Sequence, residues 1–377
     1  MRSLRCLEQY FELSRGGASH NVRPMEGLRG FAVFLVFLVH DTTLSGPWTS
    51  TDPNLSLVAD ALHTLGNSGV DLFFVLSGYL IYGSLISRPL PFTKFIGRRI
   101  IRIYPAFLAV FALYVVLSFL FPNERKIPQA LPEALIYLTE NMLLLPGILP
   151  IEPLVTVAWS LSYEMTYYLA IPLVITLFSL RKRSLVWRIC FFSCLAIAGF
   201  LAGAYFGGPL RLLMFVSGIL LFEIMKWSPD TSPGSTLSLA CGLLGLLSPL
   251  LPLNGHVGMA IKTACLFLTF FIVCQHCFAS PTAWLARQFS RTPLRWLGNM
   301  SYSYYLLHGL TLKAAFLLLE KIWPQSGYAP GYFWILLPSM FLVSLLPTTA
   351  LFLAVERPLS LAPSLKISSK HARMRAP

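Results

Sequence analysis

Long apolar stretches alternate with short polar connections along almost the whole chain. Each stretch runs for roughly 20 residues, the length that an α-helix needs to cross the hydrocarbon core of a bilayer. The pattern therefore predicts an all-α integral membrane protein, a bundle of about ten transmembrane helices. The predicted spans cover residues 27–46, 68–87, 104–121, 156–178, 189–206, 210–226, 237–253, 258–277, 297–319 and 332–355.

Basic residues gather in alternate connections, which indicates how the predicted helices are oriented. Loops rich in Lys and Arg stay on the cytoplasmic side, so both termini are expected in the cytoplasm. Residues 1–24 are polar and basic and lack the apolar core of a cleaved signal peptide, so the first span is expected to act as the anchor. We divide the chain into a basic tail (1–26), a membrane domain (27–356) and a second basic tail (357–377).

Composition agrees with this class and argues against others. Hydrophobic residues make up 55% of the chain and charged residues 12%, which is more apolar surface than a soluble core needs. The net charge of +13 does not indicate nucleic-acid binding, because the Lys and Arg lie in short patches between spans. Cys274 and Cys277 flank His276 without a second ligand pair, so we expect helix packing there and no metal or disulfide framework.

Ionisable groups inside a span are functional candidates, because each is costly unless it pairs or lines a cavity. Arg29 and His40 of the first span are about 16 Å and about three helical turns apart, which puts them on one face at opposite ends. The predicted orientation places Arg29 at the cytoplasmic end and His40 towards the outside. The alternatives are an anchoring arginine at the membrane surface and a core histidine bonded to a neighbouring helix.

The second span enters from the outside, so Asp71 lies at a depth near that of His40. A carboxylate beside an imidazole fixes its tautomer and stabilises its protonated form, which a general base needs. Asp71 and His40 are therefore candidates for a catalytic pair. Asp41 faces about 100° away from His40 and is the weaker partner. The glycines of the second span have an alternative interpretation, close helix packing.

The fourth span begins with a polar and aromatic segment at its outer end. Ser160, Glu164 and Tyr168 share a helical face at i, i+4 and i+8. Glu164 is a candidate for orienting an acceptor hydroxyl or the histidine, and the rings of Trp159 and Tyr163 are candidates for stacking on a sugar. An interfacial aromatic belt is the alternative.

Two further groups lie in or beside the third and ninth spans. Arg98, Arg99 and Arg102 run into the third span from the cytoplasmic side, with Arg98 and Arg102 on one face. Arginines there can bind phosphates, and positive-inside anchoring is the alternative. Tyr305 and His308 lie on one face of the ninth span, where a buried structural histidine is equally consistent with the pattern.

Taken in order, these segments resemble the acyltransferase-3 family of membrane acyltransferases, whose members O-acylate bacterial polysaccharides, lipopolysaccharide, Nod factors and some antibiotics. The likeness runs from about Pro24 to Pro358. It depends on Arg29-x10-His40, Gly69-Val-Asp71-Leu-Phe-Phe-Val-Leu-Ser77-Gly78-Tyr79, Arg98-Arg99-x2-Arg102-x-Tyr104-Pro105, Trp159-Ser-Leu-x2-Glu164, Ser301-x-Ser303-x-Tyr305-x2-His308 and Glu356-x-Pro358. Each motif alone is weak, but six in this order are specific.

The resemblance implies an acyltransferase of the bacterial cytoplasmic (inner) membrane. It would take an acyl group, acetyl by default, from cytoplasmic acyl-CoA and deliver it to a hydroxyl of a sugar or glycan at the outer face. His40 would be the general base, oriented by Asp71 or Glu164, by direct attack or through an acyl-histidine. The remaining site residues would be Arg29, Arg98, Arg99 and Arg102 for the CoA phosphates, and Trp159, Ser160, Tyr163, Tyr305 and His308 for lining the substrate site.

The main alternative is a polytopic transporter of a small anionic solute or acyl carrier. A transporter should show two related halves with interrupted helices in matching positions, and the sequence shows no such pair. It would also explain the arginine cluster poorly. Several points stay open, among them the acceptor and its hydroxyl, the length of the acyl chain, the oligomeric state and the need for a separate extracytoplasmic protein.

Overall fold

The computed structural model describes residues 8–13, 22–50, 52–229, 231–323 and 330–361. Within these ranges the chain is helical and forms no β-strand. A helix satisfies its own backbone hydrogen bonds, as a segment surrounded by lipid must. The helices are α2 (Val22–Leu44), α3 (Gly46–Thr49), α4 (Pro53–Gly66), α5 (Ser68–Ser87), α6 (Phe92–Leu120), α7 (Leu131–Met142), α8 (Ala158–Leu177), α9 (Leu185–Phe206), α10 (Leu213–Trp227), α11 (Ser235–Leu247), α12 (Gly255–Ala279), α13 (Trp284–Phe289), α14 (Thr292–Asn299), α15 (Ser301–Ile322) and α16 (Phe333–Leu351).

Six segments of the described chain are long and apolar enough to cross a membrane. They are Arg23–Leu44, Pro53–Ser87, Phe92–Leu120, Leu185–Phe206, Gly255–Ala279 and Phe333–Leu361. These segments confirm the prediction of a helical membrane protein. The other predicted spans correspond to α8, α10, α11 and α15; α10 and α11 have only 15 and 13 residues. The number of about ten crossings therefore stays a prediction.

Three connections differ from the expected pattern. The second span does not begin at residue 68, because α4 precedes α5 with only Asn67 between them. The Asp52 side chain accepts hydrogen bonds from the first backbone N–H groups of α4, which is why a helix begins in the predicted outer loop. The ninth span is divided at Met300, between α14 and α15. The last span continues from α16 through a π-helical segment, Phe352–Leu361.

Close approach of glycine-bearing helices holds the centre together. A Cβ on Gly69 would lie 2.5 Å from the carbonyl oxygen of Ala32, so α5 touches the backbone of α2. A Cβ on Gly78 would lie 2.2 Å from the oxygen of Phe215, and one on Gly218 would lie 2.0 Å from that of Val75. Helices α5 and α10 therefore cross through facing glycines, the small-residue packing common in membranes. The alternative interpretation of the α5 glycines as packing residues is confirmed at both contacts.

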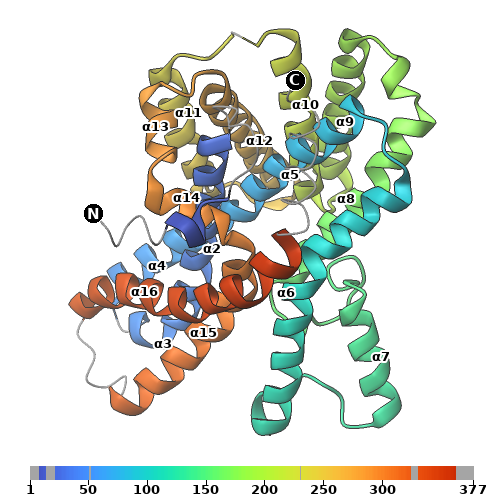
Figure 1. Cartoon of the computed structure of the whole chain (residues 1–377). Coiled ribbons are helices and arrows are strands. Elements are labelled where there is room, and N and C mark those ends of the chain that lie inside the picture. Colours follow the sequence, from blue (N-terminus) through green and yellow to red (C-terminus); the bar gives the residue numbers. More distant parts are fainter. Residues whose placement is uncertain (1–7, 14–21, 51, 230, 324–329, 362–377) are drawn as a thin grey trace.

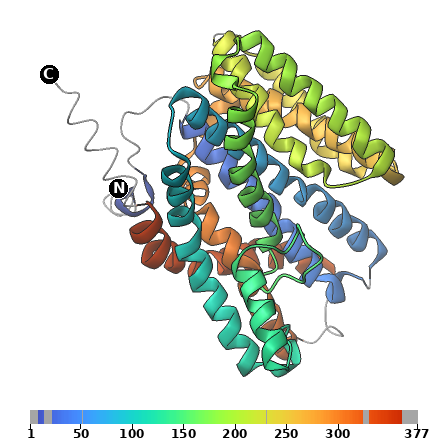
Figure 2. The same ribbon diagram turned by 90° about the vertical axis from the view of Figure 1, so that its right-hand side faces the viewer.

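The other helices surround α2, α5 and α10. Figure 1 shows α11 and α12 to the left of α10 and α5, α9 to their right, and α15 with α16 below α2. Of these helices, α9 and α12 pack against α10, and α15 packs against α2. The π-helical segment packs along α6. The turned view in Figure 2 shows α6 and α7 extending together at one end of the molecule. Residues of α2, α5, α6, α8 and α15 line a common cavity.

Parts of both predicted tails lie within the described residues. Of the first tail, residues 8–13 are described and are helical at 8–11, and residues 22–26 already belong to α2. Arg295 of α14 binds the carboxylates of Glu12 and Glu26 at 2.6 and 3.0 Å, so this segment is fixed to the bundle. Of the second tail, residues 357–361 continue the last helix, and 362–377 lie outside the described residues.

Substituting Gly218 by alanine is expected to destabilise the protein, because the new methyl group would overlap the Val75 carbonyl. Overpacking of this kind typically costs about 1–3 kcal/mol. Gly97→Ala is the matched control, since a Cβ there meets nothing within 4 Å and alanine favours the helix by up to about 1 kcal/mol. Thermal unfolding in detergent micelles should show a lower midpoint for Gly218→Ala only; equal midpoints would contradict the close crossing.

Candidate functional site

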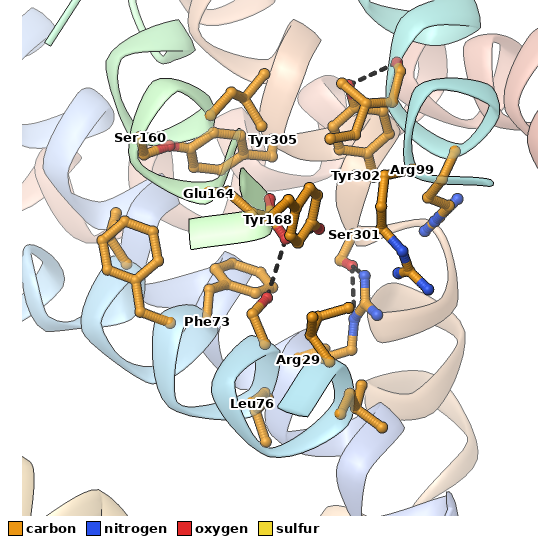
Figure 3. Close-up of a pocket in the computed structure, with 18 residues that line it drawn as sticks. Arg29, Phe73, Leu76, Arg99, Ser160, Glu164, Tyr168, Ser301, Tyr302 and Tyr305 are labelled. Atoms are coloured by element: carbon orange, nitrogen blue, oxygen red, sulfur yellow. Dashed lines mark hydrogen bonds between the residues drawn. The ribbon is translucent and has the colours of Figure 1, made fainter. Parts of the chain in front are cut away.

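A cavity of about 310 Å³ opens between α2, α5, α6, α8 and α15, and we call it the arginine cavity. Its lining consists of Arg29, Val70, Phe73, Phe74, Leu76, Ser77, Leu80, Ile81, Arg99, Arg102, Ile103, Ser160, Leu161, Glu164, Tyr168, Ser301, Tyr302 and Tyr305. Figure 3 shows Arg29 and Arg99 on one side together with Ser301, whereas Ser160 and Tyr305 lie on the other. The cavity therefore has a cationic end and a hydroxyl-rich end.

Two of the three lining arginines are fixed by oxygen acceptors. Arg29 donates from Nη2 to the Ser301 hydroxyl at 3.0 Å. Arg102 forms an ion pair of 2.6 Å with Glu356, whose side chain is fully buried. The same carboxylate accepts a hydrogen bond of 3.0 Å from the backbone N–H of Ser303. The π-helical segment, which carries Glu356, thus positions the Arg102 side chain.

The third lining arginine, Arg99, is held by aromatic rings. Its guanidinium lies 5.4 Å from the ring centre of Phe95 and 5.6 Å from that of Tyr168. Arg98, which the sequence grouped with Arg102, is exposed and does not line the cavity. The apolar residues of α6 explain this difference, because the buried face through Phe95 and Ile103 includes Arg99 and leaves Arg98 to one side.

Glu164 lies in the wall of the arginine cavity, between its two ends. Its carboxylate accepts a hydrogen bond of 3.0 Å from the Ser77 hydroxyl, and a second one from the Tyr168 hydroxyl. Ser160, Glu164 and Tyr168 all line this cavity, as their helical spacing predicts. Glu164 therefore connects α5 with the aromatic ring that lies against Arg99.

The hydroxyl-rich end is closed by a hydrogen bond between α8 and α15. The hydroxyl oxygens of Ser160 and Tyr305 are 2.6 Å apart. Phe73 of α5 packs edge-on against the Tyr305 ring, with ring centres 6.1 Å apart. Both predicted lining residues thus belong to the arginine cavity.

His40 lies beyond this end and contacts a second histidine. The ring of His40 packs edge-to-face on that of His308, with ring centres 4.9 Å apart. His308 donates from Nδ1 to the carbonyl oxygen of Tyr304 at 2.8 Å, so a neutral His308 carries its lone pair on Nε2. That Nε2 atom is buried and makes no hydrogen bond with the described residues. His308 is one helical turn from Tyr305, so His40 is separated from the cavity by these two side chains.

Asp71 does not lie with His40 in the structure. Its carboxylate faces Arg211, with Oδ1 3.6 Å from the arginine Nε. Gly69 packs on α2, and Asp71, two residues further, points about 200° around α5 from that contact. Asp71 therefore faces away from the helix that carries His40, which is the physical reason that the predicted pair does not form.

Asp71 instead lines a second cavity of about 430 Å³, which we call the Asp71 cavity. Trp159 and Tyr163 line this cavity too, so adjacent residues of α8 face different spaces. The guanidinium of Arg211 lies 5.5 Å from the Trp159 ring centre. The predicted site residues are thus divided between two cavities and the His40–His308 contact.

Sequence reasoning did not single out Ser77, Tyr302 or Arg211 as site residues. Ser77 and Tyr302 stand inside the recognised motifs, and their helical faces are the signal that points to them. Arg211 stands at the very start of the predicted span 210–226, and no local pattern marks it. His276 binds Ser232 and the Pro233 carbonyl, as expected for a packing residue.

Comparison with known proteins identifies related chains. The sequence profile of the acyltransferase-3 family, described as an acyltransferase domain, matches residues 24–354. O-acetyltransferase OatA of Staphylococcus aureus is 29% identical over 319 residues, which cover 75% of this chain and 49% of OatA. Acyltransferase MdmB of Streptomyces mycarofaciens is 27% identical over 342 residues, 81% of this chain and 82% of MdmB. The chain spans about half the length of OatA. No solved structure shows a significant match.

Removing the Glu356 carboxylate should destabilise the arginine cavity, because Arg102 would keep a partly buried charge without its partner. Breaking a buried ion pair from one side typically costs about 3–5 kcal/mol. We expect Glu356→Ala to lower the thermal unfolding midpoint strongly. Glu152→Ala is the control, since its pair with Lys126 is largely exposed and should contribute at most about 1 kcal/mol. Similar midpoints for the two variants would contradict this role of Glu356.

Proposed function

Because the chain belongs to the acyltransferase-3 family, we propose that it is a membrane O-acyltransferase. In this proposal it moves an acyl group, acetyl by default, from cytoplasmic acyl-CoA to a hydroxyl of a sugar or glycan at the outer face. The names of OatA and MdmB support acyl transfer, and that of OatA supports an oxygen acceptor. The observation that carries the proposal is the arginine cavity, whose size suits a small-molecule site.

The proposal keeps about ten membrane crossings, with both termini in the cytoplasm of a bacterial inner membrane. Arg29 and Arg102 come from helices far apart in the sequence and line one cavity. Such a meeting needs the basic ends of α2 and α6 at the same end of the bundle. This arrangement supports the orientation derived from the loop charges.

The cationic end of the cavity is proposed to bind the phosphates of acyl-CoA. Guanidinium groups donate paired hydrogen bonds to phosphate oxygens, and these bonds are strong where water is excluded. Arg29, Arg99 and Arg102 line the cavity, whereas Arg98 is exposed on α6 and does not line it. The acyl end of the donor would then lie towards Ser160 and Tyr305.

His40 is proposed to act as the general base. It takes the proton of the acceptor hydroxyl while the oxygen attacks the thioester carbonyl carbon. The new C–O bond forms as the C–S bond breaks, CoA leaves as a thiolate, and the proton passes from His40 to that sulfur. A two-step route with an acyl group on His40 uses the same residues.

His308 is the group best placed to orient His40, because the two rings are in contact. Its fixed tautomer leaves an unused acceptor lone pair on Nε2, and in this proposal His308 takes the orienting role that the sequence had assigned to Asp71. Glu164 remains the second catalytic candidate, because its carboxylate lines the arginine cavity itself. The acyl end must pass Tyr305 to reach His40, so we expect this side chain to move during the reaction.

The function is tested by measuring CoA release from purified protein in micelles, with acetyl-CoA and a hydroxylated glycan. We expect acceptor-dependent release, and a loss of at least about 100-fold in kcat for His40→Ala, the usual minimum for general-base catalysis. His40→Gln keeps a polar side chain of similar size and should be equally impaired. Wild-type rates in both variants would overturn the role of His40, and no acceptor-dependent release would overturn the enzyme.

Loss of the Arg99 side chain should weaken donor binding. A charge-assisted hydrogen bond contributes about 1.5–3 kcal/mol, so KM for acetyl-CoA should rise at least about tenfold in Arg99→Ala. Lys94→Ala removes an exposed charge from the same helix and serves as the control. Arg98→Ala should resemble the control, because Arg98 does not line the cavity. A similar KM in all three variants would contradict the donor assignment.

A further inference from the structure

The Asp71 cavity is built from the predicted outer ends of four helices and their connections. Asp71 comes from the first turn of α5, Trp159 and Tyr163 from the first turns of α8, and Lys262 from α12. Arg211 lies in the short connection before α10. All these segments begin or end on the side opposite the arginine cluster in the predicted orientation. The cavity therefore faces the side from which an acceptor would arrive.

The charges of the Asp71 cavity favour an anion. Its charged lining residues are Arg211, Lys262 and Asp71, so cations exceed carboxylates. Asp71 is 3% exposed. Its Oδ1 atom lies 3.6 Å from Nε of Arg211, a distance that is longer than a hydrogen bond. The Arg211 side chain remains 31% exposed. Asp71 thus orients the arginine without neutralising the whole cavity.

The remaining lining suits a hydroxylated ring. Trp159 and Tyr163 supply flat apolar faces with polar edges, and Asn67 and Thr263 supply side-chain hydrogen-bonding groups. Sites for small polar molecules typically combine such faces with a few polar groups that fix orientation. An anion alone would need no aromatic wall.

We propose that the Asp71 cavity is an acceptor subsite that binds a sugar carrying a carboxylate or phosphate. The anionic group would bind to Arg211 and Lys262, and the sugar ring would pack on Trp159. This proposal rests on the proposed function, because it assigns the acceptor of that reaction to the class of acidic glycans. Asp71 then serves as a positioning residue for Arg211.

The position of the subsite implies an extended acceptor. Asp71 and the α2 contact of Gly69 lie on opposite sides of α5, and His40 belongs to α2. Packed helices are typically about 8–10 Å apart, so the bound sugar and His40 are separated by about one helix. The hydroxyl that is acylated would therefore lie on a residue next to the anionic one. In this proposal the subsite binds the glycan, and His40 takes the proton from the hydroxyl that is acylated.

The test measures binding without any acyl donor, by saturation-transfer NMR titration of the protein in micelles. The probes are methyl β-glucuronide, glucose 1-phosphate and the neutral methyl β-glucoside. We expect at least one anionic probe to bind at least about tenfold more tightly than the neutral one, as charge-assisted hydrogen bonds predict. The anionic probe with the lower Kd shows whether the subsite prefers a carboxylate or a phosphate. Equal Kd values for all three probes, or no binding of any, would overturn the proposal.

Substitutions test whether the preference for anionic probes comes from the Asp71 cavity. Arg211→Gln should reduce the preference at least about fivefold, and Arg211→Lys, which keeps the charge, should retain most of it. Lys262→Gln should also reduce it, and this variant decides the matter if Arg211→Gln does not fold. Lys321→Gln is the matched control, because Lys321 is exposed at the end of α15, outside the cavity. A preference that survives in Lys262→Gln, or that falls equally in Lys321→Gln, would overturn the proposal.

The two proposals fail in different ways. If acetyl transfer is detected but binding shows no preference for anions, only the acceptor subsite is wrong. If the preference is present but CoA release does not depend on an acceptor or on His40, the transferase assignment is wrong and the cavity remains an anion-binding site.

Discussion

The rotation of α5 about its own axis is the constraint on which the site depends. Gly69 fixes one face of α5 against α2, and Gly78 fixes another against α10. Neither contact tolerates a Cβ without a backbone shift, so α5 has little freedom to turn. That rotation directs Ser77 into the arginine cavity and Asp71 into the other cavity. A pair of glycine contacts therefore decides which polar side chains of α5 line which cavity.

Helix α8 forms the wall between the two cavities. Ser160 and Glu164 face the arginine cavity, whereas their neighbours Trp159 and Tyr163 face the Asp71 cavity. Consecutive residues of a helix point about 100° apart, so one short segment can line both spaces. The family-like motif Trp159-Ser-Leu-x2-Glu164 is short for this reason, because its residues line both cavities.

The apolar pattern predicted the helices, and the face of α8 followed from a spacing of four residues. The family match over residues 24–354 confirms the resemblance that the ordered motifs predicted. The pairing of Asp71 with His40 was wrong, because depth along two helices does not determine how each is rotated. Gly69 indicates the rotation of α5, since a small residue marks the helical face that packs most closely. Arg211 could not be identified, because only the folded chain brings its connection beside Asp71.

The bond between Ser160 and Tyr305 separates the proposed donor space from the proposed base. A transferase that uses a thioester must keep water away from it until the acceptor is bound. The hydroxyl pair is buried and closes the end of the arginine cavity nearest His308. A neutral hydrogen bond contributes only about 0.5–1.5 kcal/mol net, so breaking it costs little compared with the binding of a substrate. In the proposed reaction, closure by such a weak contact between α8 and α15 reconciles a protected donor with a base, His40, that lies behind Tyr305 and His308.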